Sequence, residues 1–214
     1  MEMNINSNVG EELKIYKQIY NLSIIKHENK IKKEFFEYCK NSNLFLILII
    51  YDKEGKIYLQ ENGLDQFRLV GERIKKEEKD IRTSVKRIIY NVYNTIKIDE
   101  LEPIALLENK FIYNNEETIH NGIGIMVRVD NIPKDIEKYF YKVTDSLLEC
   151  IGAFSNRELV RIYNERYEKM QKDINSNFQD EEIQTNLKYQ KRYKFHNKIV
   201  KRFILTPKIK KKKN

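Results

Sequence analysis

Hydrophobic residues recur every three or four positions in several parts of the chain, a spacing that predicts helices with one buried face. We expect such helices within residues 11–40 (one or two helices), 78–94, 133–152 and 155–170. The second is the most regular, because Ile81, Ile88 and Ile89 belong to an unbroken apolar stripe. The third is bounded by Pro133 near its start and Gly152 after its end.

Other stretches follow the patterns of strands and turns. We expect strands at residues 44–51, 56–60, 67–70, 103–113 and 118–129. The first, "LFLILIIY", is apolar on both faces, as in a strand buried at the centre of a sheet. Polar turns at 52–55 and 114–117 join strands into two hairpins. Residues 173–182 show neither pattern and predict a linker.

The formal net charge of +8 is concentrated at one end of the chain. Residues 183–214 contain twelve Lys or Arg and no Asp or Glu, which leaves residues 1–182 with a net charge of 8 − 12, or −4. Positive charge is therefore a property of the C-terminal tail and not of the whole fold. With only seven Gly and three Pro, the chain should be rich in regular elements.

The two cysteines, Cys39 and Cys150, are far apart in the sequence and match no metal-binding spacing. We expect both as small buried side chains in a reducing compartment, with a disulfide as the less favoured alternative. The longest apolar run has eight residues, against the ~20 of a membrane-spanning helix. No secretory signal pattern is present in the first thirty residues. These features predict a cytoplasmic protein without a transmembrane segment.

The residues at the joints between elements carry a further pattern. The stretch "FRLVGERI" places Phe67, Leu69 and Gly71 just before the most regular helix. "TIKIDELEPIALLE" follows that helix, and "IHNGIGIMVRV" supplies the last strand of the long hairpin. Together with the opening hairpin, this order of elements from about Leu44 to Met170 resembles the Nudix superfamily.

The resemblance implies a Nudix-like α/β/α sandwich with a mixed sheet, an α/β fold. The sequence adds N-terminal helices and a basic C-terminal helical tail. We therefore expect an N-terminal helical extension at 1–41, a Nudix-like domain at 42–175 and a basic helix or tail at 183–214. Members of the family cleave diphosphates linked to another moiety, so the resemblance also implies a nucleotide-like or diphosphate-containing ligand.

The family's signature, the Nudix box, reads G-x5-E-x7-R-E-U-x-E-E-x-G-U, where U is apolar. Gly71 and Glu77 have the first spacing, and a loop longer by two residues brings Arg87 into register. The positions of the helix glutamates are then occupied by Ile88, Asn91 and Val92. No Asp or Glu occurs between Val85 and Thr95, so no small shift in register restores a carboxylate.

Magnesium chemistry explains why these carboxylates matter. Mg²⁺ takes hard oxygen ligands in near-octahedral geometry, mostly carboxylates and substrate phosphate oxygens. It then neutralises developing charge and activates the attacking water. An apolar helix supplies none of these ligands. The sequence therefore predicts a Nudix-like binding or regulatory module with weak or no hydrolase activity.

A divergent Mg²⁺-dependent hydrolase of nucleoside diphosphate derivatives is the alternative. Its magnesium ligands would be Glu72, Glu77 and Glu78, and its catalytic residues Glu77, Glu78 and Arg87. With or without hydrolysis, the candidate ligand-binding residues are Gly71, Arg73, Glu116 and Glu117. Each has a simpler interpretation, because acidic residues are common at helix N-termini and charges in turns are solvated. Gly122 and Gly124 would allow a bulge or a close approach beside the ligand.

The tail supports a third hypothesis, a nucleic-acid-associated protein. Its candidate contacts are Lys191, Arg192, Lys194, Lys198, Lys201 and Arg202. Cations that neutralise phosphates release counterions, and the Tyr and Phe rings between them can stack on unpaired bases. The same residues fit an amphipathic helix on an anionic membrane surface, or a helix packed on the domain with its lysines in solvent.

Overall fold

The computed structural model describes residues 7–40, 44–63, 66–93 and 97–177. The chain divides into two compact units, Met1–Tyr167 and Glu168–Asn214, and the first contains the sheet. In chain order the elements are α1 (Ser7–Ile19), β1 (Ser23–Lys30), α2 (Lys33–Lys40), β2 (Phe45–Tyr51), β3 (Ile57–Tyr58), β4 (Gln60–Glu61), β5 (Phe67–Arg68), β6 (Val70–Arg73), α3 (Ile81–Val92), β7 (Lys97–Tyr113), β8 (Glu116–Asp130), α4 (Lys134–Glu137), β9 (Phe140–Tyr141), α5 (Asp145–Cys150) and α6 (Phe154–Asn177).

One mixed sheet organises the first unit, with strands in the order β1-β7-β8-β2-β3-β9 and β6 also paired with β2. β2 runs parallel to β8 and antiparallel to β3 and β6, while β1 runs parallel to β7. Both expected hairpins are confirmed. The turn of the long hairpin has Asn114 and Asn115 at φ values of 46° and 67°. Asparagine tolerates this left-handed backbone, which a two-residue hairpin turn requires.

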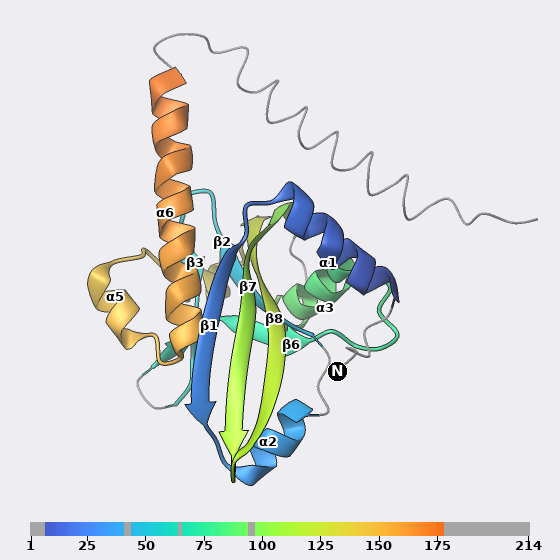
Figure 1. Ribbon diagram of the computed structural model, residues 1–214. Helices are drawn as coiled ribbons and strands as arrows, with labels where there is room; N and C mark the ends of the chain where they lie inside the picture. Colours follow the sequence, from blue (N-terminus) through green and yellow to red (C-terminus); the bar gives the residue numbers. More distant parts are fainter. Residues whose placement is uncertain (1–6, 41–43, 64–65, 94–96, 178–214) are drawn as a thin grey trace, which may run out of the picture. The chain divides into compact units, whose positions relative to one another are not determined.

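Two hydrophobic cores lie on opposite faces of the sheet, because successive residues of a strand point to opposite sides. Along β2, Leu46, Leu48 and Ile50 join a core with α1 and α3, whereas Ile47, Ile49 and Tyr51 join a core with the N-terminal half of α6. Figure 1 shows these helices on either side of the strands. Helices therefore cover both faces of a mixed sheet, in agreement with the expected α/β class.

The prediction of only helices in residues 11–40 was wrong. Residues 23–30 form the strand β1, which pairs along its whole length with β7. Its burial explains the error, because Ile25 is the only buried residue of β1 and the others are polar or exposed. Pairing with the long hairpin, and not local periodicity, determines this strand.

The helix expected at residues 133–152 is interrupted. α4 ends at Glu137, Phe140 and Tyr141 then pair with β3, and Thr144 caps α5 by accepting a hydrogen bond from the Leu147 amide. Phe140 is buried in the core beneath α3, which favours the strand. The strand expected at 67–70 is likewise divided into β5 and β6.

The last described helix is longer than expected. α6 continues to Asn177 and so includes part of the stretch predicted as a linker. The basic tail at 183–214 lies outside the described residues. Both cysteines are free thiols, with Cys39 buried as expected but Cys150 exposed, contrary to its prediction. None of the helices described has the length and apolar character needed to cross a membrane.

Candidate functional site

The N-terminus of α3 is closed by carboxylates from this chain. Asp80 caps the helix, with its Oδ1 accepting a hydrogen bond from the Thr83 amide at 2.6 Å. Glu12 of α1 accepts one from the Ile81 amide at 2.8 Å. Helix N-termini readily bind phosphate and other anions. Here two of the available amides are already occupied.

Arg87 lies at the centre of the candidate site, between the strand β6 and the loop at residues 74–80. Its Nε donates a hydrogen bond to Glu78 Oε1 at 2.6 Å, and its Nη1 donates to Glu72. Its Nη2 donates to the carbonyl of Arg73 at 2.8 Å. One guanidinium thus ties the strand, the loop and the helix together, in the bidentate geometry for which arginine is well suited.

Glu78 is the most buried acidic residue of this cluster, with only 7% of its side chain exposed. The Ser84 hydroxyl and the Lys75 amide each donate to its Oε2 at 2.7 Å. Burial alone would raise the pKa of Glu78, but the hydrogen bonds from Arg87, Ser84 and Lys75 together lower it. Glu78 is therefore an ionised carboxylate whose oxygens already have donors.

The residues present at this site do not fit a magnesium ion. Glu72 and Glu78 both direct their oxygens at the Arg87 guanidinium, and Asn91 donates a further hydrogen bond to Glu72 at 3.4 Å. Glu77 is exposed in the loop and does not join them. Within the described ranges, no group of three or more His, Cys, Asp or Glu side chains is placed to hold a metal. The arrangement acts chemically as an ionic lock.

Arg73 and Gly71 lie on β6 but do not join the Arg87 cluster through their side chains. Arg73 follows Glu72 in the strand and so points to the opposite face. Its Cζ lies 3.2 Å from the centroid of the Tyr38 ring on α2, and its Nη2 donates to the Tyr38 carbonyl at 3.0 Å. A Cβ at Gly71 would lie 3.1 Å from the carbonyl oxygen of Leu46, so glycine allows close strand pairing here.

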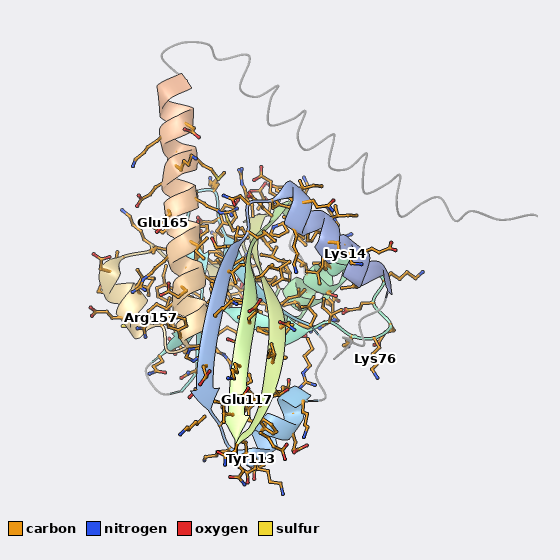
Figure 2. The ribbon with its side chains drawn as sticks, in the orientation of Figure 1. Lys14, Lys76, Tyr113, Glu117, Arg157 and Glu165 are labelled. Atoms are coloured by element: carbon orange, nitrogen blue, oxygen red, sulfur yellow. The ribbon has the colours of Figure 1, made fainter. Side chains whose placement is uncertain are left out.

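The structure separates the hairpin carboxylates from this cluster. Glu116 pairs with Lys40 at 2.9 Å and Glu117 with Lys110 at 2.7 Å. Arg73 of β6 lies opposite Phe45 of β2, and Phe45 in turn lies opposite Gly122 of β8. Six residues of strand separate Gly122 from Glu116, a distance of roughly 20 Å. Figure 2 accordingly shows Glu117 near Tyr113 at the end of the hairpin and Lys76 well apart from both.

The glycines of β8 make room for core side chains. A Cβ at Gly122 would come within 2.5 Å of the Phe45 ring, and one at Gly124 would overlap Leu159 of α6. The close approach expected at these glycines therefore exists, but in the structure the approaching groups belong to the chain itself.

Cys39 is near a histidine without forming a reactive pair. Its Sγ lies 4.0 Å from Nδ1 of His120, and both side chains are buried. Burial raises the pKa of the Cys39 thiol to about 11, while Arg73 lowers it to a smaller extent. The thiol is thus protonated at neutral pH, and thiolates, not thiols, act as nucleophiles.

Sequence reasoning missed Glu12 and Ser84, two residues that shape the site. Glu12 is 69 positions from Ile81, and nothing in the spacing of residues connects them. Ser84 could have been recognised as a site residue only if the position of Glu78, to which its hydroxyl donates a hydrogen bond, had been known. The six predicted tail contacts, Lys191 to Arg202, lie outside the described residues.

The fold and site define a mixed α/β protein with helices on both faces of its sheet and an arginine-centred ionic lock. A scan against models of known protein families finds no match to this chain, and a search of curated proteins finds no similar sequence.

Proposed function

We propose that the chain is a Nudix-like domain that binds a nucleotide-like or diphosphate-containing ligand without efficient hydrolysis. The proposal for the ligand is supported by the order of elements from the opening hairpin to α6, with the loop at residues 74–80 and α3 between two hairpins. The sequence-predicted candidates for contact with the ligand are Gly71 and Arg73 of β6, which precede this loop. The Arg73 guanidinium, on the face of β6 opposite Glu72, also contacts Tyr38 of α2.

One observation carries the proposal of weak or absent hydrolysis. α3 has no carboxylate from Ile81 to Val92, and Glu72 and Glu78 beside it are engaged by Arg87. Asp80 and Glu12 accept hydrogen bonds from the amides at its N-terminus. To bind Mg²⁺, Glu72 and Glu78 would have to give up their charged hydrogen bonds with the Arg87 guanidinium in exchange for the ion. Such an exchange would leave Arg87 partly buried without its counterions, which is energetically costly.

The test uses the full chain with Mg²⁺ or Mn²⁺ and a panel of nucleoside diphosphate derivatives. We expect calorimetry to show saturable binding of at least one compound, with no product above the protein-free rate by chromatography. Arg73→Gln should weaken that binding about tenfold, the usual effect of losing one charged hydrogen bond. Lys26→Gln, at an exposed ion pair with Glu108, is the matched control and should not change it.

Two results would contradict the proposal. Metal-dependent turnover that Glu77→Gln abolishes would establish the divergent hydrolase, and because Glu77 is exposed, loss of folding would not explain that effect. Failure of every compound in the panel to bind would remove the ligand-binding role.

A further inference from the structure

Five cations lie along the loop at residues 74–80 and the outer face of α3. This set, called the basic surface below, consists of Lys75, Lys76, Lys79, Arg82 and Lys86. The four lysines are exposed and Arg82 is half-buried. Within the described part of the chain, none of the five side chains forms a salt bridge. Figure 2 shows Lys76 in the loop that leads to α3.

This lack of salt bridges is notable because acidic residues are plentiful outside the tail. Residues 1–182 have a net charge of −4, and cations elsewhere in the sheet, such as Lys26 and Lys110, are paired. Two of the three acids in this loop are already engaged, since Glu78 binds Arg87 and Asp80 caps α3. The third, Glu77, is exposed and offsets one of the five positive charges. The result is a concentration of positive charge on a domain that is otherwise acidic.

The outer face of α3 also presents an aromatic ring in line with these charges. Arg82, Lys86 and Tyr90 are four residues apart, so they form one row along the helix with steps of about 6 Å. Tyr90 is 63% exposed, whereas Tyr93 on the inner face is buried. The row thus consists of two cations followed by an aromatic ring whose face is accessible to another planar group.

We propose that the basic surface and Tyr90 bind single-stranded nucleic acid. The cations would follow the phosphates, releasing counterions, and the Tyr90 ring would stack on an unpaired base. This site is separate from Arg87, which faces β6, and it does not depend on the proposed small-molecule ligand.

An anionic membrane is a poorer partner for the same surface. A helix that lies on a membrane inserts an apolar face among the lipids. The apolar face of α3, including Ile81, Val85 and Ile88, is already buried in the core against the sheet. The exposed face offers charges and a single ring, which suits a polyanion with accessible bases.

The test measures the fluorescence anisotropy of a labelled single-stranded oligonucleotide of about 20 nucleotides. This length exceeds the number of nucleotides that one single-strand-binding domain usually covers. The surface variant of the full chain combines Lys76→Gln, Lys79→Gln, Arg82→Gln and Lys86→Gln. The control variant combines Lys26→Gln, Lys40→Gln, Lys53→Gln and Lys110→Gln, which removes the same charge from residues in ion pairs. Circular dichroism of both variants is the check that they remain folded.

We expect the surface variant to bind at least about tenfold more weakly near 50 mM salt. Its slope of log affinity against log salt should be smaller by about 3, since each lost phosphate contact on a single strand contributes roughly 0.7. The control variant should keep the original slope. The same difference should persist when Lys191, Arg192, Lys194, Lys198, Lys201 and Arg202 are all changed to Gln, which separates the basic surface from the tail.

Tyr90→Ala tests the stacking contact separately. It should weaken binding at least about fivefold with no change in salt slope, because the lost contact carries no charge. Equal weakening in the surface and control variants would overturn the proposal, as would an unaltered affinity in Tyr90→Ala. Loss of binding to phosphatidylserine vesicles in the surface variant, with oligonucleotide binding intact, would instead assign the surface to membranes.

Discussion

Arg87 shows how a residue expected at a catalytic position can have a structural role. Its guanidinium holds Glu72 on one side and Glu78 on the other, so that the loop between them is fixed against α3. Removing one partner from such a pair leaves a partly buried charge without compensation, which costs more than the intact pair contributes. The cluster is therefore expected to stabilise the fold only when all its members are present and ionised.

The pH dependence of unfolding should reveal this requirement. The pKa of Glu78 is lowered in the folded state, so its stabilising contribution is present above the unfolded value of about 4.3 and is lost as pH falls through the folded pKa. We expect the difference in unfolding free energy between the native chain and Glu78→Gln to decrease as pH falls from 6 to 3, as measured by urea titration.

Glu12 provides a control of opposite sign for this experiment. Burial raises its pKa, despite the hydrogen bonds from the Ile81 amide and Tyr16 that lower it. Its contribution is therefore present below about 4.3 and is lost as pH rises through the folded pKa. The difference between the native chain and Glu12→Gln should decrease as pH rises. The same trend in both variants would contradict these assignments.

At the scale of elements, α6 lies close to the sheet because β8 has a glycine beneath it. Leu159 of α6 occupies the space that a side chain at Gly124 would fill. Glycine normally weakens a strand, since it packs nothing and loses more conformational freedom on folding. Here that cost is offset by the burial of Leu159, Val160 and Tyr163 against the sheet.

Two glycine substitutions should therefore have opposite effects on stability. Gly124→Ala should reduce the unfolding free energy by about 1–3 kcal/mol, because Leu159 must move away from a well-packed core. Gly10→Ala, in α1 with no atom within 4 Å of the added Cβ, should raise it by about 0.5–1 kcal/mol. Chemical denaturation measures both. An unchanged midpoint for Gly124→Ala would show that α6 is less closely packed than described.

The same scale shows which elements the sequence could predict. The stripe in α3 and the apolar run in β2 were confirmed because each is buried continuously and so leaves a clear pattern. β1 was missed because it is an edge strand with little buried surface. β9 was missed because it has only two residues, too few to show an alternating pattern beside residues with helical spacing. The acid-free helix was visible in the sequence, but the ionic lock depends on a fold that brings Glu72 and Glu78 to Arg87.

At the scale of the whole first unit, the two cores are joined by one strand. β2 contributes alternate residues to both cores, so Leu48 packs beneath α3 while its neighbour Ile49 packs beneath α6. A strand hydrogen-bonded on both edges and buried on both faces has little freedom to adjust locally. The two helical layers should therefore unfold together and not in sequence.

Leu48→Ala tests this coupling, because it creates a cavity in one core only. We expect a loss of about 2–5 kcal/mol in unfolding free energy. Amide hydrogen exchange should show lower protection both in α3 and in Phe154–Tyr167 of α6, since their slowest exchange would require the same global opening. Ile24→Ala, at a side chain that is 60% exposed, is the control and should leave protection unchanged. Lower protection in α3 alone would mean that the two cores are independent units that share a strand without sharing stability.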